Sequence, residues 1–485
     1  MRRYLMILEV SQKQAYIFAS RALKDNICRS DHISYATSSE YFSDCCYDCY
    51  SEKNLVYSGG GHTVLQFSTR EQAVAFSRVL TRQAAADFPD MDIFVTIKEY
   101  DKNLTPGENL IALSAALEKK KAERSASFRR IRFGIESSEN EPTIIDVPHE
   151  LPGTPAGWTL TEDINEIAND DNFVAIVHID GNGMGKRLQN IYNAGAKSWE
   201  DCVDILRRFS EDTKQHYSEA YDETSEELAA MLESDKKNDR ISHILPMRKI
   251  IGAGDDVCFV CAGNLALECA ASFLKNLQTK VNSADGKNYA ACAGIVLVHT
   301  KYPFREAYDL SEELCSNAKK YGAELKDDGS VCAIDWHIEF GQLKDDLNEI
   351  RKDYIAEDGT NMTLRPLVVI GGEPPVERTY EFFTTLVNNF IENRTQLARS
   401  KVKALRTAFA QGRIETALAI RSNQIEDVLW YGLEKRFPNW LNTAVKEKNI
   451  EHSAYMTDAD GIEHCLYFDA IESMDHVKLF GRAQQ

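Results

Sequence analysis

Three aspartates are the residues of this sequence whose types and spacing could do chemistry. Asp180 ends the strongly apolar run Phe173–Ile179, and Asp255 and Asp256 stand in the turn Gly252–Asp256 between two more apolar runs. If these strands are neighbours, three carboxylates meet at one sheet edge, where they cannot all stay ionised without a cation. Mg²⁺ takes oxygen ligands and leaves positions open for phosphate. The pattern predicts a site for two divalent ions, Mg²⁺ or Mn²⁺, suited to phosphoryl chemistry.

Glycines follow the first aspartate. Gly181, Gly183 and Gly185 remove side chains where a triphosphate must approach backbone amides at the start of a helix. The alternative is that Gly-Asp-Asp is only a tight hairpin turn, because Asp and Gly favour turns. The metal site is favoured because the turn interrupts a very apolar hairpin and a second aspartate ends another apolar strand.

A lysine lies at the end of the last long helix of this half. Lys319, in Ala318-Lys-Lys-Tyr-Gly322, could reach the β- and γ-phosphates as a point charge. It could equally be a basic residue that complements the helix dipole. The residues alone leave both interpretations open.

The elements that must position these residues follow a recognisable order. Strands are expected at 173–179, 249–261 (two), 289–298 and 331–338, and helices from 186, over 198–240, over 264–281 and over 304–321, the last ended by Gly322. The order β, α, ββ, α, β, α, β is that of a ferredoxin-like palm with a helix-rich insertion.

The first 150 residues repeat this order. Strands are expected at 4–10 and 91–99, a hairpin around three glycines at 55–67, and helices at 70–86 and 107–124. In the overlay, Ser11 falls on Asp180, and His62 and Thr63 fall on the two turn aspartates. The interval from strand to hairpin is about 24 residues longer in the second copy, which fits an extra charged helical segment.

These patterns predict an α+β fold with three domains. A first palm is expected at 1–150, a second at 151–340 and an α-helical C-terminal domain at 341–485. The Pro- and Gly-rich segments 151–157 and 371–375 are candidate breaks. The first palm lacks the acids in this overlay, so it is expected to be non-catalytic.

Composition limits the class of protein. The chain has 485 residues, 43% of them hydrophobic, and a net charge of −19, which excludes a mostly disordered chain and argues against a uniformly nucleic-acid-binding surface. No apolar run approaches the ~20 residues of a membrane span. The twelve cysteines are too few for a disulfide scaffold, and many lie in apolar strands, so a reducing cytoplasm is expected.

Two further clusters have open interpretations. Cys28, Cys45, Cys46 and Cys49 could bind Zn²⁺, although the spacing is incomplete and free thiols are the simpler reading. The segments 394–421 and 119–132 are basic and could contact an RNA backbone. Solvated helix faces paired with neighbouring acids explain them equally well.

The motifs together resemble a known family. The carrying segments are His178-Ile-Asp180-Gly-Asn-Gly-Met-Gly185, Gly252-Ala-Gly-Asp255-Asp256, and Tyr302-Pro-Phe-Arg305 leading into Ala318–Gly322, with Arg365-Pro-Leu and Arg399–Arg406 near the C-terminus. They are similar to the palm of the nucleotidyl cyclase superfamily that includes GGDEF diguanylate cyclases. The closer resemblance is to the large tandem-palm subunit of type III CRISPR effector complexes, a cyclic oligoadenylate synthase.

The resemblance implies a function and a set of site residues. ATP would be joined by attack of a 3′-hydroxyl on an α-phosphate, with loss of pyrophosphate, to give a cyclic or linear oligoadenylate messenger in antiviral defence. The implied metal ligands and catalytic acids are Asp180, Asp255 and Asp256, with the Ile179 carbonyl as a further ligand. The implied nucleotide-binding residues are Gly181, Asn182, Gly183, Met184, Gly185, Ala253, Gly254 and Lys319, with Ser58, Gly59, Gly60 and Gly61 in the first palm, which would hold a second, acceptor ATP.

Departures from the family pattern keep other functions open. No His-Asp dipeptide occurs, so the family's N-terminal nuclease domain looks absent, and Ala253 replaces a glycine, which a turn tolerates if its φ is negative. The alternatives are an RNA-binding scaffold subunit of a type III CRISPR ribonucleoprotein and a cyclase that makes another cyclic nucleotide. Expected partners are a nucleoside triphosphate, guide or target RNA, other CRISPR subunits or a second copy of the chain, and no membrane.

Overall fold

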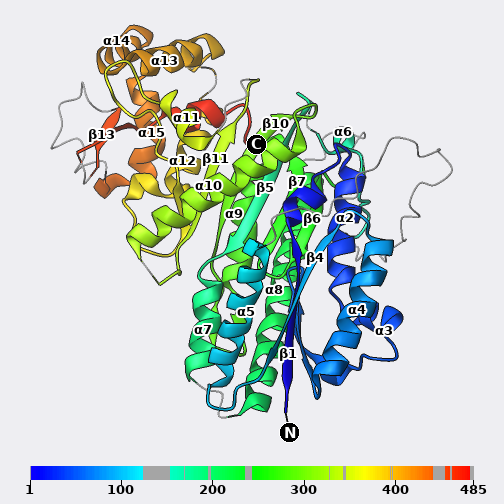
Figure 1. Cartoon of the computed structure of the whole chain (residues 1–485). Coiled ribbons are helices and arrows are strands. Elements are labelled where there is room, and N and C mark those ends of the chain that lie inside the picture. Colours follow the sequence, from blue (N-terminus) through cyan, green and yellow to red (C-terminus); the bar gives the residue numbers. More distant parts are fainter. Residues whose placement is uncertain are drawn as a thin grey trace.

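The computed structural model of the chain describes most of its residues (Figure 1). The described residues are 2–123, 153–168, 170–194, 198–234, 243–326, 328–341, 346–393, 395, 397–440, 454–458 and 461–480. The first part of the predicted linker and the 124–132 part of the second basic segment lie outside these residues.

The N-terminal half forms a four-stranded antiparallel sheet in the order β2-β3-β1-β4. Its elements are β1 (Tyr4–Ser11), α1 (Lys13–Ile17), α2 (Leu23–Ala36), α3 (Ser39–Cys45), a 3₁₀ turn (Glu52–Asn54), β2 (Leu55–Gly59), β3 (His62–Phe67), α4 (Arg70–Asp87), β4 (Asp92–Glu99) and α5 (Pro106–Glu123). Alternate residues of β1 enter different cores: Leu5 and Ile7 join a cluster with α5, and Met6 and Leu8 join the main core.

The second half forms a six-stranded sheet in the order β12-β11-β10-β5-β7-β6. Its elements are α6 (Ile164–Ile167), β5 (Phe173–Gly181), α7 (Met184–Ala194), α8 (Trp199–Ser234), β6 (Met247–Ala253), β7 (Asp256–Ala262), a 3₁₀ turn (Gly263–Leu265), α9 (Ala266–Gln278), β8 (Val281–Asn282), β9 (Lys287–Asn288), β10 (Ala291–His299), α10 (Phe304–Leu325), β11 (Cys332–Ile338), α11 (Leu347–Lys352) and β12 (Leu367–Ile370). The strands β6-β7-β5-β10 repeat the order of the first sheet. The predicted ferredoxin-like α+β fold with two palms is therefore confirmed.

Two details of the second palm differ from the sequence interpretation. The helix α10 does not end at Gly322 but continues to Leu325, and Gly322 is buried within it against Val331. This glycine therefore does not terminate the helix. The strand β11 is not the last one, because β12 pairs with it beyond residue 340. The domain boundaries themselves stay a prediction.

The C-terminal region is mostly helical and lies at the β12 side of the second sheet, with α13 and α14 at its outer end (Figure 1). It contains a 3₁₀ turn (Val376–Arg378), α12 (Tyr380–Glu392), α13 (Arg399–Gln411), α14 (Arg413–Asn423), α15 (Glu426–Arg436), the small hairpin of β13 (Tyr455–Thr457) and β14 (Glu463–Cys465), and α17 (Phe468–Ser473). The strand β12 and this hairpin depart from the all-helical domain predicted for 341–485.

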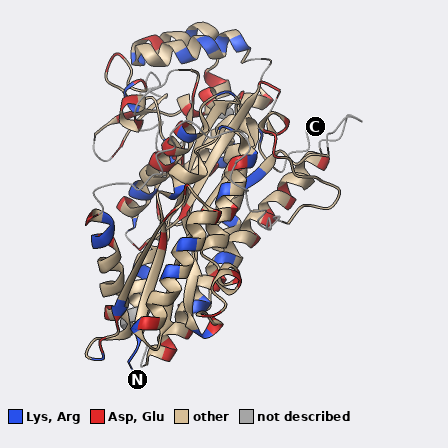
Figure 2. Ribbon diagram, turned by 45° about the vertical axis from the view of Figure 1, so that its right-hand side comes forward, with Lys and Arg blue, Asp and Glu red and all other residues tan. Residues whose placement is uncertain are grey.

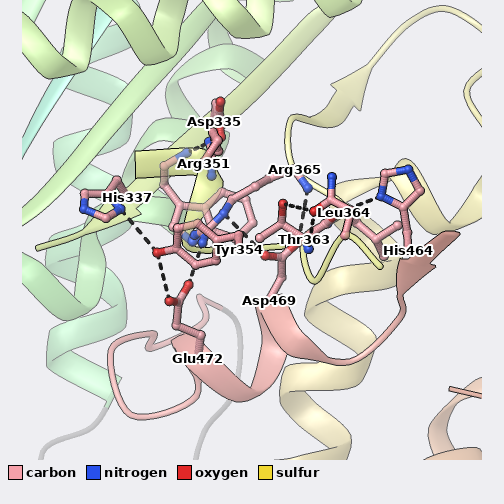
Figure 3. A network of polar contacts seen from close by, with 12 residues as sticks. Asp335, His337, Arg351, Tyr354, Thr363, Leu364, Arg365, His464, Asp469 and Glu472 are labelled. Carbon is pink, nitrogen blue, oxygen red and sulfur yellow. Dashed lines mark hydrogen bonds and ion pairs between the residues drawn. The ribbon is translucent and has the colours of Figure 1, made fainter. Parts of the chain in front are cut away.

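A buried charge network joins this region to the second palm (Figure 3). Arg365, just before β12, is fully buried and donates to Glu472 of α17 at 2.6 Å, while Asp469 accepts from the Leu364 and Arg365 amides. The Arg365 guanidinium also lies 4.9 Å from the Trp336 ring centroid. The side chain is thus held by charge and by an aromatic face.

The two palms pack on each other reciprocally. Helix α2 of the first palm contacts β6 of the second, and α8 of the second contacts β2 of the first. Phe18, just after α1, lies against Tyr308 of α10 with ring centroids 4.2 Å apart, and α5 contacts α7 in the matching arrangement. Each palm therefore contacts the other through equivalent elements, and this arrangement brings the two hairpins face to face.

All twelve cysteines are free thiols. None of the helices in the described part of the chain is both long and apolar enough to cross a membrane.

Candidate active site

The three aspartates lie at one edge of the second sheet. Asp180, near the end of β5, pairs directly with Asp256, the first residue of β7, and the Gly181 amide donates to the Asp255 carbonyl at 3.1 Å. The hairpin tip therefore folds over the end of β5. The structure brings together the carboxylates of Asp180, Asp255 and Asp256 from three sequence positions.

Their surroundings disfavour full ionisation. Burial, followed by the neighbouring charge of Asp180, raises the pKa of Asp255 to about 6 and that of Asp256 to about 7. Beneath them, His178 Nδ1 lies 3.6 Å from Asp256 Oδ1, and neither atom has a hydrogen-bond partner among the described residues. Burial also lowers the pKa of His178, so this ring does not supply the missing positive charge.

Lys319 reaches this edge from α10. Its Nζ lies 2.5 Å from Asp180 Oδ2 and donates to the Gly181 carbonyl at 2.9 Å. The close approach of α10 to the sheet depends on Gly294 of β10, because a Cβ there would lie 1.9 Å from the Ser311 carbonyl oxygen. Gly294 therefore allows α10 to pack close enough to the sheet for Lys319 to contact Asp180.

The glycine-rich turn follows β5 directly. A Cβ at Gly181 would lie 2.6 Å from the hydroxyl of Tyr217, so only glycine fits there. Gly183 has φ of 63°, and α7 begins at Met184, with Gly185 as its second residue. Asn182 turns away from the acids, since its Nδ2 donates to the Val331 carbonyl at 2.7 Å.

The hairpin tip has the backbone that its sequence requires. The positive φ of the turn, 72°, falls on Gly254, and Ala253 has no positive φ, so alanine is tolerated there as expected. Ile179 is fully buried in β5 between β7 and β10.

A cavity of about 290 Å³ lies between the two palms. Its floor includes Asp255 and Asp256 of the second palm, and its opposite wall includes Lys13, Gly59 and Gly60 of the first. Apolar side chains complete it, among them Ile33, Met184, Leu188 and Phe209. Such a mixture of flat apolar walls and a few polar groups suits a nucleotide, with Asp180 and Lys319 just beyond the lining.

The strand register corrects the overlay of the first palm. Glu9, not Ser11, is the counterpart of Asp180, because Glu9 pairs with His62 as Asp180 pairs with Asp256. Gly61 is then the counterpart of Asp255, since the Val10 amide donates to its carbonyl at 3.0 Å, as the Gly181 amide does to that of Asp255.

His62 therefore matches Asp256 and not Asp255. Thr63, expected opposite Asp256, matches the next residue and is buried, donating to the Thr37 carbonyl. The prediction that the first palm has no acid at the matching positions is therefore wrong for Glu9, because the overlay took Ser11 at the end of β1 instead of Glu9 inside the strand.

The corrected register reveals a second acid–lysine pair. Lys121 Nζ of α5 lies 2.9 Å from Glu9 Oε2, as Lys319 lies beside Asp180. Phe94, which pairs with Glu9, precedes Lys121 by 27 residues, and Cys292 precedes Lys319 by the same interval. This pair was not predicted from the sequence, because the equal interval can be counted only after strand pairing has matched Phe94 with Glu9 and Cys292 with Asp180.

The predicted first-palm nucleotide residues divide into two groups. Gly59 and Gly60 line the cavity, and a Cβ on Gly60 would lie 3.5 Å from the Ala253 carbonyl oxygen, so the two hairpin tips meet. Ser58 points elsewhere, donating to the Thr37 carbonyl at 2.8 Å, and Gly61 packs on Ile33.

The cysteine cluster is only partly assembled. Cys45 Sγ lies 3.2 Å from Cys46 Sγ, while Cys28 Sγ lies 3.3 Å from His32 Nε2. Over the described residues, no group of three or more His, Cys, Asp or Glu side chains is arranged to hold a metal ion. For these cysteines, this leaves free thiols as the reading that the geometry favours.

The basic segments are largely paired with neighbours. In the 119–132 segment Lys121 binds Glu9, and Lys120 donates to the Val95 carbonyl. In the 394–421 segment, Lys and Arg gather on the α13–α14 pair (Figure 2), where Arg413 binds Glu463 and Arg406 lies 3.9 Å from Glu472. Arg394 lies outside the described residues.

The aspartates fit a divalent ion that substrate helps to hold. They do not form a ready cage of three ligands in the described part of the chain. Mg²⁺, however, binds through one or two carboxylates plus substrate phosphates rather than in all-protein cages. The unpartnered Oδ1 of Asp256, beside the carboxylate of Asp180, is the kind of ligand set that such an ion requires.

Comparison with known proteins agrees with this geometry. Residues 173–328 match the family model of Cas10/Cmr2, second palm domain. None of the curated proteins compared matches the chain. The family resemblance stated from the sequence motifs is confirmed for the segment that carries Asp180, Asp255, Asp256 and Lys319.

Solved structures extend the similarity to nearly the whole chain. A Csm1–Csm4 cassette in complex with cA4 has 13% identity and a TM-score of 0.56, covering 98% of this chain and 70% of that one. A Csm1–Csm4 cassette in complex with AMPPNP has 14% identity and a TM-score of 0.55, covering 98% and 69%. Csm1 in T. onnurineus has 12% identity and a TM-score of 0.50, covering 98% and 70%. At these identities the structures establish a shared fold.

Proposed function

We propose that the chain is a nucleotidyltransferase that joins ATP into a cyclic or linear oligoadenylate messenger of type III CRISPR defence. The observation that carries the proposal is the meeting of Asp180, Asp255 and Asp256 at the floor and rim of a cavity shared by two palms. A 3′-hydroxyl of one nucleotide would attack the α-phosphate of the other, with pyrophosphate as the leaving group.

The residues of the second palm would have separate roles in binding metal ions and phosphate. Asp180, Asp255 and Asp256, with the Ile179 carbonyl, would hold two Mg²⁺ or Mn²⁺ ions, which supply activation of the hydroxyl and charge stabilisation at the phosphate. Lys319 would place its ammonium on phosphate oxygens in exchange for part of its contact with Asp180. The first-turn amides of α7, at Gly183–Gly185, would bind phosphate because a helix begins there.

The related structures support ATP as the substrate class. Crystal structures of similar Csm1–Csm4 cassettes hold cA4, cA3, pppApA and AMPPNP. These ligands belong to those proteins, and the shared fold with the shared palm motifs extends them to this chain as a proposal.

Incubation with ATP and Mg²⁺, followed by chromatography of the products, tests the proposal. The wild type should release pyrophosphate and form oligoadenylates, and Asp255→Ala should form none while keeping its circular dichroism spectrum. Asp204→Ala, at an exposed carboxylate of α8, is the matched control and should keep wild-type activity. A folded wild type that neither binds nor consumes any nucleoside triphosphate would refute the proposal, and a different cyclic product would indicate another cyclase.

We propose a second protein subunit as a partner, because the similar structures are Csm1–Csm4 cassettes. A role mainly as an RNA-binding scaffold is the competing function. Activity of the purified chain without RNA, and loss of that activity in Asp255→Ala, would separate the enzyme from the scaffold.

A further inference from the structure

We propose that Lys13 replaces a divalent ion in the first palm, so that this half of the cavity binds the triphosphate of a nucleoside triphosphate without metal. The inference deepens the proposed function and rests on it for the identity of the ligand. It is carried by the residue correspondence between the palms and by the charges that face the cavity.

The correspondence places Lys13 at the matching start of a helix. Gln12 has φ of 51° and precedes α1, as Gly183 has φ of 63° and precedes α7. Lys13 is therefore the counterpart of Met184, and both line the cavity. A non-glycine residue in the left-handed region is uncommon, which makes the match specific.

The side chain of Lys13 fills the space that an acid takes in the other palm. Gly61 is the counterpart of Asp255, and a Cβ built on Gly61 would lie 3.1 Å from Cε of Lys13. The stem of the lysine thus runs where the Asp255 side chain would begin, and its ammonium donates to the Gly60 carbonyl at the hairpin tip. The ammonium of Lys13 therefore lies beside the hairpin tip of the first palm. At the matching hairpin tip of the second palm, a divalent cation is proposed to bind.

The charges of the two halves are opposite. At the positions that match the site of the second palm, the first palm has the acid Glu9 and the lysines Lys13 and Lys121, and the nearby His62 is neutral because burial lowers its pKa to about 4. The second palm has three acids and Lys319. One half attracts phosphate directly, whereas the other needs metal ions to do so.

Charged groups of both palms act on the ammonium of Lys13. Burial lowers its pKa, and the charges of Glu9, Asp256 and Asp255 oppose that change. Lys13 therefore lies between the acids of its own palm and those of the facing palm. A phosphate group entering the first half would complete its hydrogen bonding as well as its charge.

Isothermal titration with AMPPNP, in EDTA and then in Mg²⁺, tests the inference. The wild type should bind one equivalent in EDTA, and Lys13→Met, which keeps the apolar stem, should weaken that binding about 10- to 100-fold, the range expected for a lost charged hydrogen bond. Lys13→Arg should restore most of it. Lys24→Met, at an exposed lysine of α2, should bind as the wild type does.

Three results would overturn the inference. The wild type could fail to bind in EDTA, or Lys13→Met could bind unchanged. Lys13→Met could also strengthen Mg²⁺ binding alone, which would make Lys13 a countercharge for Asp255 and Asp256. Product formation from ATP is measured separately. Binding that depends on Lys13 but gives no product would refute the proposed function, while the metal-free nucleotide site would still be supported.

Discussion

Replacing Asp256 by asparagine should stabilise the metal-free protein at neutral and alkaline pH while abolishing its activity. Burial and the adjacent Asp180 raise the pKa of Asp256 from 3.8 to about 7. The folded state therefore holds this proton more tightly than the unfolded state. Stability is lost as the pH rises from 3.8 toward 7, and the full loss is present above it.

The magnitude follows from the same pKa. A rise of about three pKa units, at 1.36 kcal/mol each, corresponds to about 4 kcal/mol as an upper limit. The side chain is 35% exposed, so solvent screening reduces this to about 2 kcal/mol. Asparagine keeps the size of the side chain and removes the charge, so Asp256→Asn should recover about 2 kcal/mol at pH 8 and almost none at pH 4.

Urea unfolding in EDTA at several pH values between 4 and 8 measures this difference. Asp204→Asn, at an exposed carboxylate, is the control and should stay within about 0.5 kcal/mol of the wild type at every pH. A gain for Asp256→Asn that is the same at pH 4 and pH 8, or a loss at pH 8, would show that burial and Asp180 do not raise the pKa of Asp256 in the folded protein.

Three further substitutions probe the elements around the site. Lys319→Met should lower oligoadenylate formation about 100-fold in a chromatographic assay with little change in melting temperature, and an unchanged rate would remove the lysine from the reaction. Gly294→Ala should destabilise the protein by about 1–3 kcal/mol in urea and also lower activity, because the new methyl group collides with the Ser311 carbonyl and displaces α10; unchanged stability would contradict the close packing. Arg365→Met should cost about 3–5 kcal/mol, since it removes the nearest cation from the buried carboxylates of Glu472 and Asp469, and a cost below 1 kcal/mol would show that the network of Figure 3 is not a structural link.

The second palm was the part of the chain most open to prediction. Five of its strands, β5, β6, β7, β10 and β11, are apolar runs, and β5 is buried almost throughout, so the ends of these strands could be placed to within about two residues. Once the palm order was recognised, Asp180 and Asp256 had to be neighbours, because β5 and β7 pair in that order.

The first palm was predicted less well, for physical reasons. Glu9 lies inside β1 and not at its end, so the pattern of an acid after an apolar run does not mark it. Its partner Lys121 belongs to a basic run that suggests a solvated helix face. Only the pairing of β1 with β3 and β4 fixes the register, and pairing between distant strands is not encoded in local sequence.

The C-terminal network could not be predicted at all. Asp335, Arg365 and Glu472 are far apart in the sequence, and each alone looks like a surface charge. They become a buried cluster because β11, β12 and α17 pack together, which periodicity does not reveal.

The unequal charges of the two palms follow from what one shared cavity can hold. If Gly61 and His62 were acids like their counterparts, two carboxylates would join those of Asp255 and Asp256 at a cavity of about 290 Å³, with Asp180 and Glu9 nearby, and each would raise the pKa of the others. Two nucleotides would then require two sets of metal ions within a few ångströms. With Lys13 in the first half, a single set of acids remains at the place where the α-phosphate must react. Under the proposed function, the duplication would supply two matching nucleotide positions, and the smaller number of acids in one of them would decide which phosphate is attacked.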